Sequence, residues 1–265
     1  MKNLLSGLFL YSLLFTMGTK SFAQEPSEKW ELIWQEEFNY EGEPDPEKWS
    51  FAPRQSSDWA CYCADNDSTR YVKNGNLHLR GIINTRPGDS AKYNTGCIRT
   101  TDKFSFKYGK IEVRAKLDQG KGSWPAIWMM PQDPKYGGWP HSGEIDIMEQ
   151  LNSDSIVYQT LHSNYIDVQQ KKEDPLYYTT APYKVDEFNV YGVEWYPDRL
   201  EFFVNGRKTF TYPRIINADS KQWPFDQEFF IILDQALGGS WVGSIKDEDL
   251  PVEMLVDWVR VYQEE

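Results

Sequence analysis

The sequence predicts an all-β domain built as a sandwich or a barrel. Apolar and polar residues alternate with a period of two along most of the chain, and long segments with helical periodicity are absent. The alternating runs are short, and Gly, Pro, Asn and Asp separate them, as is typical of turns between strands. Two antiparallel sheets packed together would give one concave face that can form a cleft.

The first 23 residues have the pattern of a secretory signal peptide. A basic Lys2 precedes an apolar run over 4–17, and the small residues Ser21 and Ala23 suit cleavage after Ala23. The alternative, a membrane anchor, would need about 20 apolar residues to span a bilayer, and this run is shorter. We therefore expect export to the periplasm or the exterior. Residues 24–265 then form one domain of ordinary size for an all-β fold.

Five later segments give the clearest strand patterns, and the third of them contains Asn205-Gly206, the strongest short signal for a β-hairpin. The fourth is apolar throughout, which predicts a strand buried on both faces. In order, the segments are 74–81, 109–118, 199–212, 228–237 and 252–263.

Charge and aromatic content narrow the classes of partner. The formal net charge is −12, and removal of Lys2 and Lys20 makes it −14. A chain this acidic is poorly suited to nucleic acid or to anionic membrane surfaces. It has 11 Trp and 16 Tyr, more than a core of this size requires. Flat aromatic rings stack on sugars, so the excess favours a carbohydrate cleft over the other classes.

The three cysteines leave several alternatives open. Cys97 could form a disulfide with Cys61 or with Cys63 in an exported protein. A metal site would need a fourth ligand that the spacing does not supply. The simplest expectation is three small, half-buried thiols.

The segment GEIDIMEQ, residues 143–150, concentrates three carboxylates on a predicted strand. Glu144 and Asp146 share one face, and strict alternation would put Glu149 on the other. One bulged residue near Ile147 or Met148 would return Glu149 to the acidic face. We expect that bulge because the chemistry of paired carboxylates requires it.

Two carboxylates on one strand suit glycoside hydrolysis with retention. Five residues at about 3.3 Å span roughly 16 Å, and side chains leaning together can reach the ~5–5.5 Å separation of the retaining geometry. Asp146 between them would raise the pKa of a neighbour and keep one carboxyl protonated. The alternatives are a solvated acidic strand or a calcium site, although calcium prefers flexible loops with Gly and Asn.

Beyond this motif, the chain resembles glycoside hydrolase family 16 in its laminarinase-like branch, whose signature is E-x-D-x-x-E. The resemblance covers nearly the whole mature chain in the order of the family. It implies a concanavalin-like β-jelly roll with an open, endo-acting cleft on the concave sheet. The matching segments besides 143–150 are LIWQEEFN (32–39), GKIEVRAKL (109–117), GSWPAIWMMP (122–131), YGVEWYPDRLEFFVNG (191–206), ALGGSWVG (236–243) and VDWVRVYQ (256–263).

The resemblance assigns roles to the residues that match. It implies Glu144 as nucleophile, Asp146 as the assisting acid and Glu149 as acid/base, with His162 orienting the central carboxylate. It also implies substrate-binding positions at Trp124, Trp128, Trp139, Arg99 and Trp241. Of the two tryptophans in GSWPAIWMM, Trp128 is the one more suited to core packing.

The family needs no redox cofactor or nucleotide, and many members bind a structural calcium on the convex face. Glu37 and Asp257 lie in the segments that match that site. The expected partner is a polysaccharide or glycan chain, and we expect a monomer. No other catalytic motif is present: the sequence has no GxSxG, no HExxH and no Gly-rich phosphate loop.

Three departures from the laminarinase pattern lie where substrate side groups would be recognised: SDWACYCADND (57–67), Gln235 in DQALGG, and HSNYIDVQQKKEDP (162–175). The expected function is a secreted retaining endo-β-glycanase acting on β-1,3- or mixed-linkage β-1,3-1,4-glucan. An endo-β-1,4-galactosidase of poly-N-acetyllactosamine or mucin glycans is the alternative. A non-catalytic, lectin-like binding domain is the rival from another class, since fold does not fix function.

Overall fold

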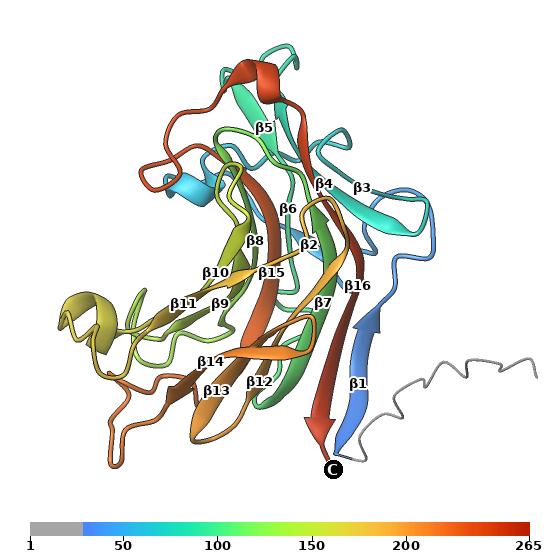
Figure 1. The fold of residues 1–265 in the computed structure, drawn as a ribbon. Helices are drawn as coiled ribbons and strands as arrows, with labels where there is room; N and C mark the ends of the chain where they lie inside the picture. The colour runs from blue at the N-terminus through green and yellow to red at the C-terminus, as the bar shows by residue number, and fades with distance from the viewer. Residues whose placement is uncertain (1–28) are drawn as a thin grey trace, which may run out of the picture.

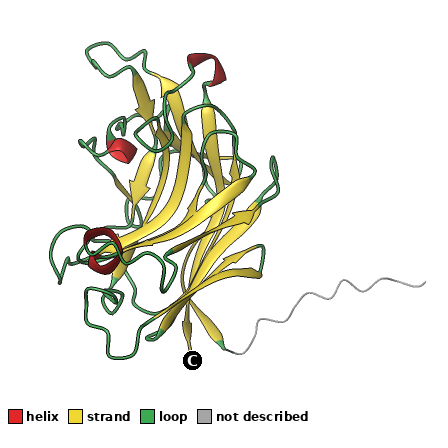
Figure 2. Ribbon diagram, turned by 60° about the vertical axis from the view of Figure 1, so that its left-hand side comes forward, coloured by secondary structure: helices red, strands yellow, loops and turns green. Residues whose placement is uncertain are grey.

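A computed structural model describes residues 29–265 as two antiparallel β-sheets packed face to face (Figures 1 and 2). One sheet has nine strands, with β1 paired to β16 and β5 paired to β4 at the sides of its main path. That path runs β14 (Arg207–Pro213), β13 (Arg199–Val204), β12 (Asn189–Trp195), β7 (Gly109–Leu117), β16 (Val252–Glu264), β4 (Asn76–Ile83), β3 (Arg70–Lys73), with β1 (Trp30–Glu36) and β5 (Tyr93–Thr95) beside it.

The second sheet has seven strands, and its central strands carry the acidic motif. Phe229–Leu237 is buried at every position, as the apolar run predicted. The order is β11 (Tyr178–Pro182), β10 (Ile156–His162), β9 (Glu144–Glu149), β8 (Ser123–Pro131), β15 (Phe229–Leu237), β6 (Cys97–Arg99), β2 (Ser50–Phe51).

The core lies between the two sheets because each strand turns its apolar side chains inward. Ile111, Val113 and Ala115 of β7 are fully buried, while the charged residues between them remain partly exposed. The predicted hairpin is present, with φ of 52° at Asn205 and 74° at Gly206. The predicted all-β sandwich and its five clearest strands are therefore confirmed.

Helical structure is limited to three short segments in the described part of the chain. Two of them, η1 and η2, lie on the outer side of the seven-stranded sheet in both views (Figures 1 and 2). No helix within residues 29–265 is long and apolar enough to cross a membrane. The segments are η1 (Asp58–Ala60), the π-helix η2 (Asn164–Val168) and η3 (Asp247–Asp249).

Two sequence predictions concern the chain's covalent and N-terminal features. Cys63 and Cys97 form a disulfide with a Cα–Cα distance of 5.8 Å, and Cys61 remains a free thiol. Of the alternatives left open, the Cys63–Cys97 disulfide with one thiol left over is confirmed and three thiols is wrong, because β6 brings Cys97 against the loop that contains Cys63. The predicted signal peptide, residues 1–23, lies outside the described residues and stays a prediction.

Candidate active site

Strand β9 presents all three carboxylates on the outer face of the seven-stranded sheet. Asp146 pairs with Trp128 of β8, and Met148 pairs with the preceding residue, Ile127, so β9 contains one extra residue at Ile147. The pairing with β10 shows the same shift. This is the predicted bulge, and it returns Glu149 to the face of Asp146 while Ile147 and Met148 remain in the core.

The carboxylates lie in a cleft of about 640 Å³. The lining includes no Lys or Arg side chain from the described residues, so His162 is its one basic group. Most of the remaining surface is aromatic, as expected of a site that stacks sugar rings. The aromatic lining residues are Trp59, Trp124, Trp128, Trp139, Tyr158, Tyr177, Tyr178 and Trp241.

Glu144 has two groups that favour its ionised form. Trp139 donates its indole N–H to Oε2 of Glu144 at 2.7 Å, and His162 Nε2 lies 4.0 Å from Oε1. Burial raises the pKa of Glu144, while the charge of His162 and the Trp139 hydrogen bond oppose that rise. Burial disfavours the ionised carboxylate of Glu144, and His162 and Trp139 partly offset that cost.

Glu149 has less support for its charge. Its one hydrogen bond from a described side chain comes from the indole N–H of Trp124, at 3.0 Å to Oε1. Burial raises the pKa of Glu149 to about 7, against the lowering effect of Trp124. The carboxyl therefore retains its proton near neutral pH, which a general acid requires.

Asp146 lies between them and is 2% exposed. Its Oδ2 is 3.4 Å from His162 Nε2. Burial raises its pKa well above the usual range, and repulsion from Glu144 and then Glu149 raises it further. Three carboxyls this close cannot all be ionised, so the group holds at least one proton.

The same residues raise the question of a metal. One ligand atom each from Glu144, Asp146 and His162 lies within 4.8 Å of the others, close enough for one cation. The pKa of His162 is about 9: burial lowers it, but the hydrogen bond to Asp167 and the surrounding carboxylates raise it more. A metal would have to displace the proton from this imidazole, so metal binding by the cluster would compete with its protonation.

The cleft contains most of the residues that the sequence placed there. Trp124, Trp139, Trp241 and His162 line it, and Trp139 is 58% exposed at the rim. Trp128 is only 6% exposed; it packs in the floor and donates its N–H to Asp234 at 2.7 Å. It therefore packs in the cleft floor, and its role in substrate binding stays a prediction.

Two predicted substrate contacts lie elsewhere. Gln235 is fully buried on the core side of β15, where its amide donates to Ser123 Oγ at 3.0 Å. It cannot contact a substrate from there, and its neighbour Asp234 takes the cleft position because side chains alternate along a strand. Arg99 is half-buried on β6 opposite Ile232 and does not line this cleft.

Trp59 is a cleft residue that the sequence analysis missed. It lies in η1, and its ring meets that of Trp128 edge-on at 4.9 Å. Nothing local in SDWACYCADND identifies this contact, since the partner lies 69 residues later in the chain. Asp234, Asp167 and the three lining tyrosines were also missed; strand alternation in DQAL could have indicated Asp234.

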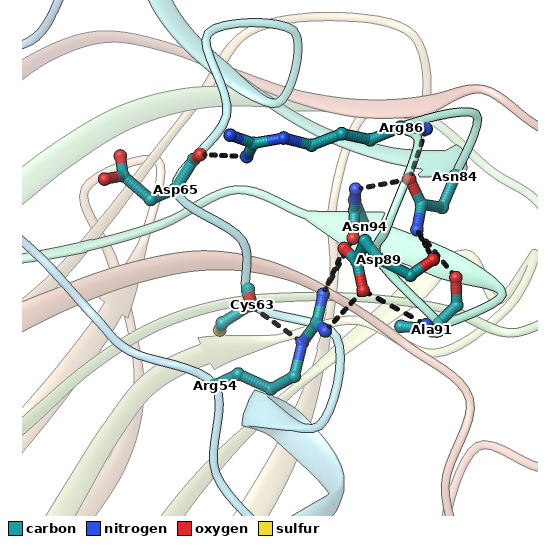
Figure 3. A network of polar contacts seen from close by, with 8 residues as sticks. All are labelled: Arg54, Cys63, Asp65, Asn84, Arg86, Asp89, Ala91 and Asn94. Atoms are coloured by element: carbon teal, nitrogen blue, oxygen red, sulfur yellow. Dashed lines mark hydrogen bonds and ion pairs between the residues drawn. The ribbon is translucent and has the colours of Figure 1, made fainter.

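The loop that contains Trp59 is held by a polar network (Figure 3). Arg54 donates to both carboxylate oxygens of Asp89, at 2.8 and 3.0 Å, and to Asn94 Oδ1 at 2.9 Å. Its Nε also donates to the carbonyl of Cys63, the residue that the disulfide ties to β6. Beyond the network, Asp58 accepts hydrogen bonds from Ser240. The loop that carries Trp59 is thus fixed by hydrogen bonds and the disulfide on both sides of this residue.

The residues expected to bind calcium are paired with arginines. Glu37 accepts two hydrogen bonds from Arg260, at 2.7 and 3.0 Å, and Asp257 pairs with Arg114. A cation would have to compete with these ion pairs for the carboxylate oxygens. Calcium binding at Glu37 and Asp257 stays a prediction.

The chain was compared with known families and proteins. A family model described as glycosyl hydrolases family 16 matches residues 58–260. The chain is 43% identical over 235 residues to the keratan-sulfate endo-1,4-β-galactosidase of Sphingobacterium multivorum, covering 88% of this chain and 55% of that protein. It is 35% identical over 278 residues to the β-glucanase of Rhodothermus marinus, covering 96% and 93%.

Solved structures give the same result. The laminarinase of Rhodothermus marinus superposes with a TM-score of 0.79 at 32% identity, covering 89% of this chain and 98% of that one. The predicted jelly-roll sandwich is thereby confirmed. The chain spans about half the length of the galactosidase but nearly all of the glucanase.

Proposed function

Since the chain belongs to glycoside hydrolase family 16, we propose that it cleaves internal β-glycosidic bonds of a glycan with retention of configuration. Glu144 is the nucleophile, Glu149 the acid/base, and Asp146 the assisting carboxyl between them. His162 orients Asp146. These side chains and water suffice for the chemistry, and one chain supplies all of them, in keeping with a monomer.

The unequal environments of the two glutamates support this assignment best. Glu144 receives an indole N–H and lies beside the charged imidazole, whereas Glu149 receives an indole N–H alone. A nucleophile must be ionised and a general acid protonated, and the two environments favour those two states.

The reaction follows in two steps. An oxygen of Glu144 forms a bond to the anomeric carbon while the glycosidic bond breaks and Glu149 gives its proton to the leaving oxygen. Water then attacks the same carbon, Glu149 takes the proton of that water, and the bond to Glu144 breaks. Two inversions leave the released sugar in the β configuration.

For the substrate we propose a β-1,3- or mixed-linkage β-1,3-1,4-glucan, in line with the relatives named β-glucanase and laminarinase. The second candidate is a β-1,4-galactosyl bond in poly-N-acetyllactosamine or mucin glycans. It is favoured by the 43% identity to the galactosidase. In either case the cleft has acidic groups and, among residues 29–265, no Lys or Arg in its lining, which suits an unsulfated chain better than a sulfated one.

The test is product release by the mature protein and its Glu144→Gln variant. The panel comprises laminarin, mixed-linkage glucan, poly-N-acetyllactosamine, keratan sulfate and agarose. Oligosaccharides from one polymer, abolished in the variant, support the proposal and identify the sugar. Equal binding of one polymer by both forms without any cleavage would instead establish a lectin-like domain.

We also propose that the chain is exported, which rests on the composition of residues 1–23. Mass spectrometry of the protein secreted by a Gram-negative host would give the mature N-terminus, expected at Gln24. An N-terminus that retains residues 1–23 would contradict export by this route.

A further inference from the structure

We propose that Asp167 is a positioning residue of the catalytic site, which holds the imidazole of His162 so that both ring nitrogens donate hydrogen bonds, Nδ1 to Asp167 and Nε2 toward Asp146 and Glu144. The inference rests on the proposed function, because it concerns the group that keeps the nucleophile ionised. Asp167 does not line the cleft, and its hydrogen bond within the site is to His162. Its charge by itself raises the pKa of Glu144 and Asp146, so its support for an ionised nucleophile comes through the protonation of His162.

Asp167 is fixed by the segment that follows β10. Its Oδ1 lies 3.1 Å from His162 Nδ1, and its Oδ2 accepts the backbone N–H of Ser163 at 2.9 Å. The π-helix η2 brings it there, and Ser163 Oγ begins that helix by accepting the N–H of Ile166 at 3.3 Å. One oxygen of the carboxylate is therefore held by the backbone, and the other meets the imidazole.

The opposite edge of the imidazole meets the catalytic acids. His162 Nε2 is 3.4 Å from Asp146 Oδ2 and 4.0 Å from Glu144 Oε1. Asp146 Oδ2 is buried and has no hydrogen-bond partner at ordinary distance. A small approach of the Nε2–H would satisfy it, and burial makes such an unpaired oxygen unfavourable.

The acids beside Nδ1 and Nε2 determine the protonation state of the His162 imidazole. A neutral imidazole has one donor and one acceptor nitrogen. If Nδ1 donates to Asp167, a neutral ring would turn a lone pair toward Asp146, and the reverse tautomer would turn one toward Asp167. When Asp146 is ionised, only the imidazolium donates to both acids, so a carboxylate at position 167 favours the charged form. When Asp146 is protonated, its O–H can donate to a neutral Nε2 instead, and the protonation state of Nε2 distinguishes the two arrangements.

Burial lowers the pKa of His162, but Asp167, Glu144 and Glu149 around the ring raise it and favour the charged state. β9 contributes Glu144, Asp146 and Glu149, η2 contributes Asp167, and Tyr177 and Tyr178 stand near the start of β11. No Lys or Arg lines the cleft within the described residues. The resulting pKa of His162, about 9, keeps the cation beside Glu144 through neutral pH. That cation in turn lowers the pKa of Glu144.

The experiment is NMR of the imidazole nitrogens in the full-length mature protein without substrate. The chain has three histidines, so the signal of His162 is identified by its loss in His162→Gln. Asp167→Asn keeps an acceptor for Ser163 but removes the charge. Glu173→Gln removes an exposed carboxylate from the same loop and is the matched control.

In the wild type, both nitrogens of His162 should be protonated at neutral pH. Asp167→Asn should lower the titration midpoint by at least about one pH unit, the smallest shift usual for loss of an adjacent opposite charge. Glu173→Gln should leave it unchanged. On a cleaved substrate, kcat of Asp167→Asn should fall about tenfold with little change in KM, because substrate contacts are intact.

A neutral His162 in the wild type at neutral pH would overturn the proposal. This measurement uses the wild-type protein alone, so it does not depend on whether a variant folds. Equal midpoints in the wild type and Asp167→Asn would overturn it as well. Because the NMR measurement involves no substrate, its failure is distinct from a failure to find cleavage. Thermal unfolding of Asp167→Asn verifies that its effect does not come from a loss of folded protein.

Discussion

Strands β7 and β9 have nearly the same sequence pattern, but their charged side chains differ in sign and in burial. Both alternate apolar and charged residues, and both bury the apolar side against the same core. On β7 the outward charges differ in sign and remain partly exposed: Lys110 bonds Glu112 at 2.8 Å, and Arg114 pairs with Asp257. On β9 the outward charges are all acidic, and Asp146 and Glu149 are buried.

The difference shows what separates a structural charge pattern from a catalytic one. The charges of β7 are paired and partly exposed to solvent, and such surface pairs contribute roughly 0–1 kcal/mol each to the free energy of unfolding. Burial is the largest cause of the raised pKa of every carboxyl on β9, and His162 is the one basic residue that the described part of the chain places in the cleft lining. A fold retains so unfavourable a group where it serves chemistry.

The largest effect on activity is expected for Glu144→Gln on β9. An amide cannot attack the anomeric carbon, so kcat on the cleaved polymer should fall at least about 10⁴-fold. The thermal unfolding midpoint should not decrease, because one acid is removed from a crowded cluster. Activity within tenfold of the wild type would show that another group is the nucleophile.

Glu149→Gln should lower kcat by about 10²–10⁴-fold, the range for loss of a general acid–base. A substrate with a good leaving group needs little protonation, so its first step should proceed, and added azide should restore turnover because it attacks without a base. If azide has no effect, Glu149 is not the acid/base.

The pH dependence of kcat/KM reports the burial of β9 directly. Glu149 must be protonated to act as the acid, and its pKa is about 7, so kcat/KM should fall as pH rises through about 7. Trp124→Phe removes the N–H that lowers this pKa. The alkaline limb should then move up by about one unit. A downward shift would contradict the assigned hydrogen bond.

The smallest effect is expected on β7. Glu112→Gln breaks a partly exposed pair, so the free energy of unfolding should change by less than about 1 kcal/mol and kcat/KM should not change. Chemical denaturation and the polymer assay measure the two quantities. A large loss of activity would show that the charges of β7 contribute to catalysis and do not serve structure alone.

Local pattern was sufficient to predict β9. The bulge at Ile147 followed from the spacing of Glu144, Asp146 and Glu149, because only a shifted register puts all three on one face. Gln235 was chosen because it departs from the laminarinase pattern, and it lies in the core instead of the cleft. A strand buried on both faces offers no polar side from which its direction could be predicted. Asp234 occupies the cleft position instead.

Contacts between distant segments could not be predicted from the sequence. Trp59 reaches the cleft because a disulfide and the Arg54 network hold its loop against β6, and neither pairing has a local signal. Asp167 meets His162 through one turn of π-helix, a rare element without a clear sequence pattern. The catalytic carboxylates lie on one strand and could be predicted from it, whereas the residues that contact them come from distant segments brought together by the fold.

The most direct test of the two-carboxylate account is proton NMR of the product at the start of hydrolysis, using the polymer that the chain cleaves. Glu144 as nucleophile predicts that the β-anomer forms first and that the α-anomer follows only by mutarotation. If the α-anomer appears first, the bond is cleaved with inversion, and Glu144 does not form the covalent intermediate proposed here.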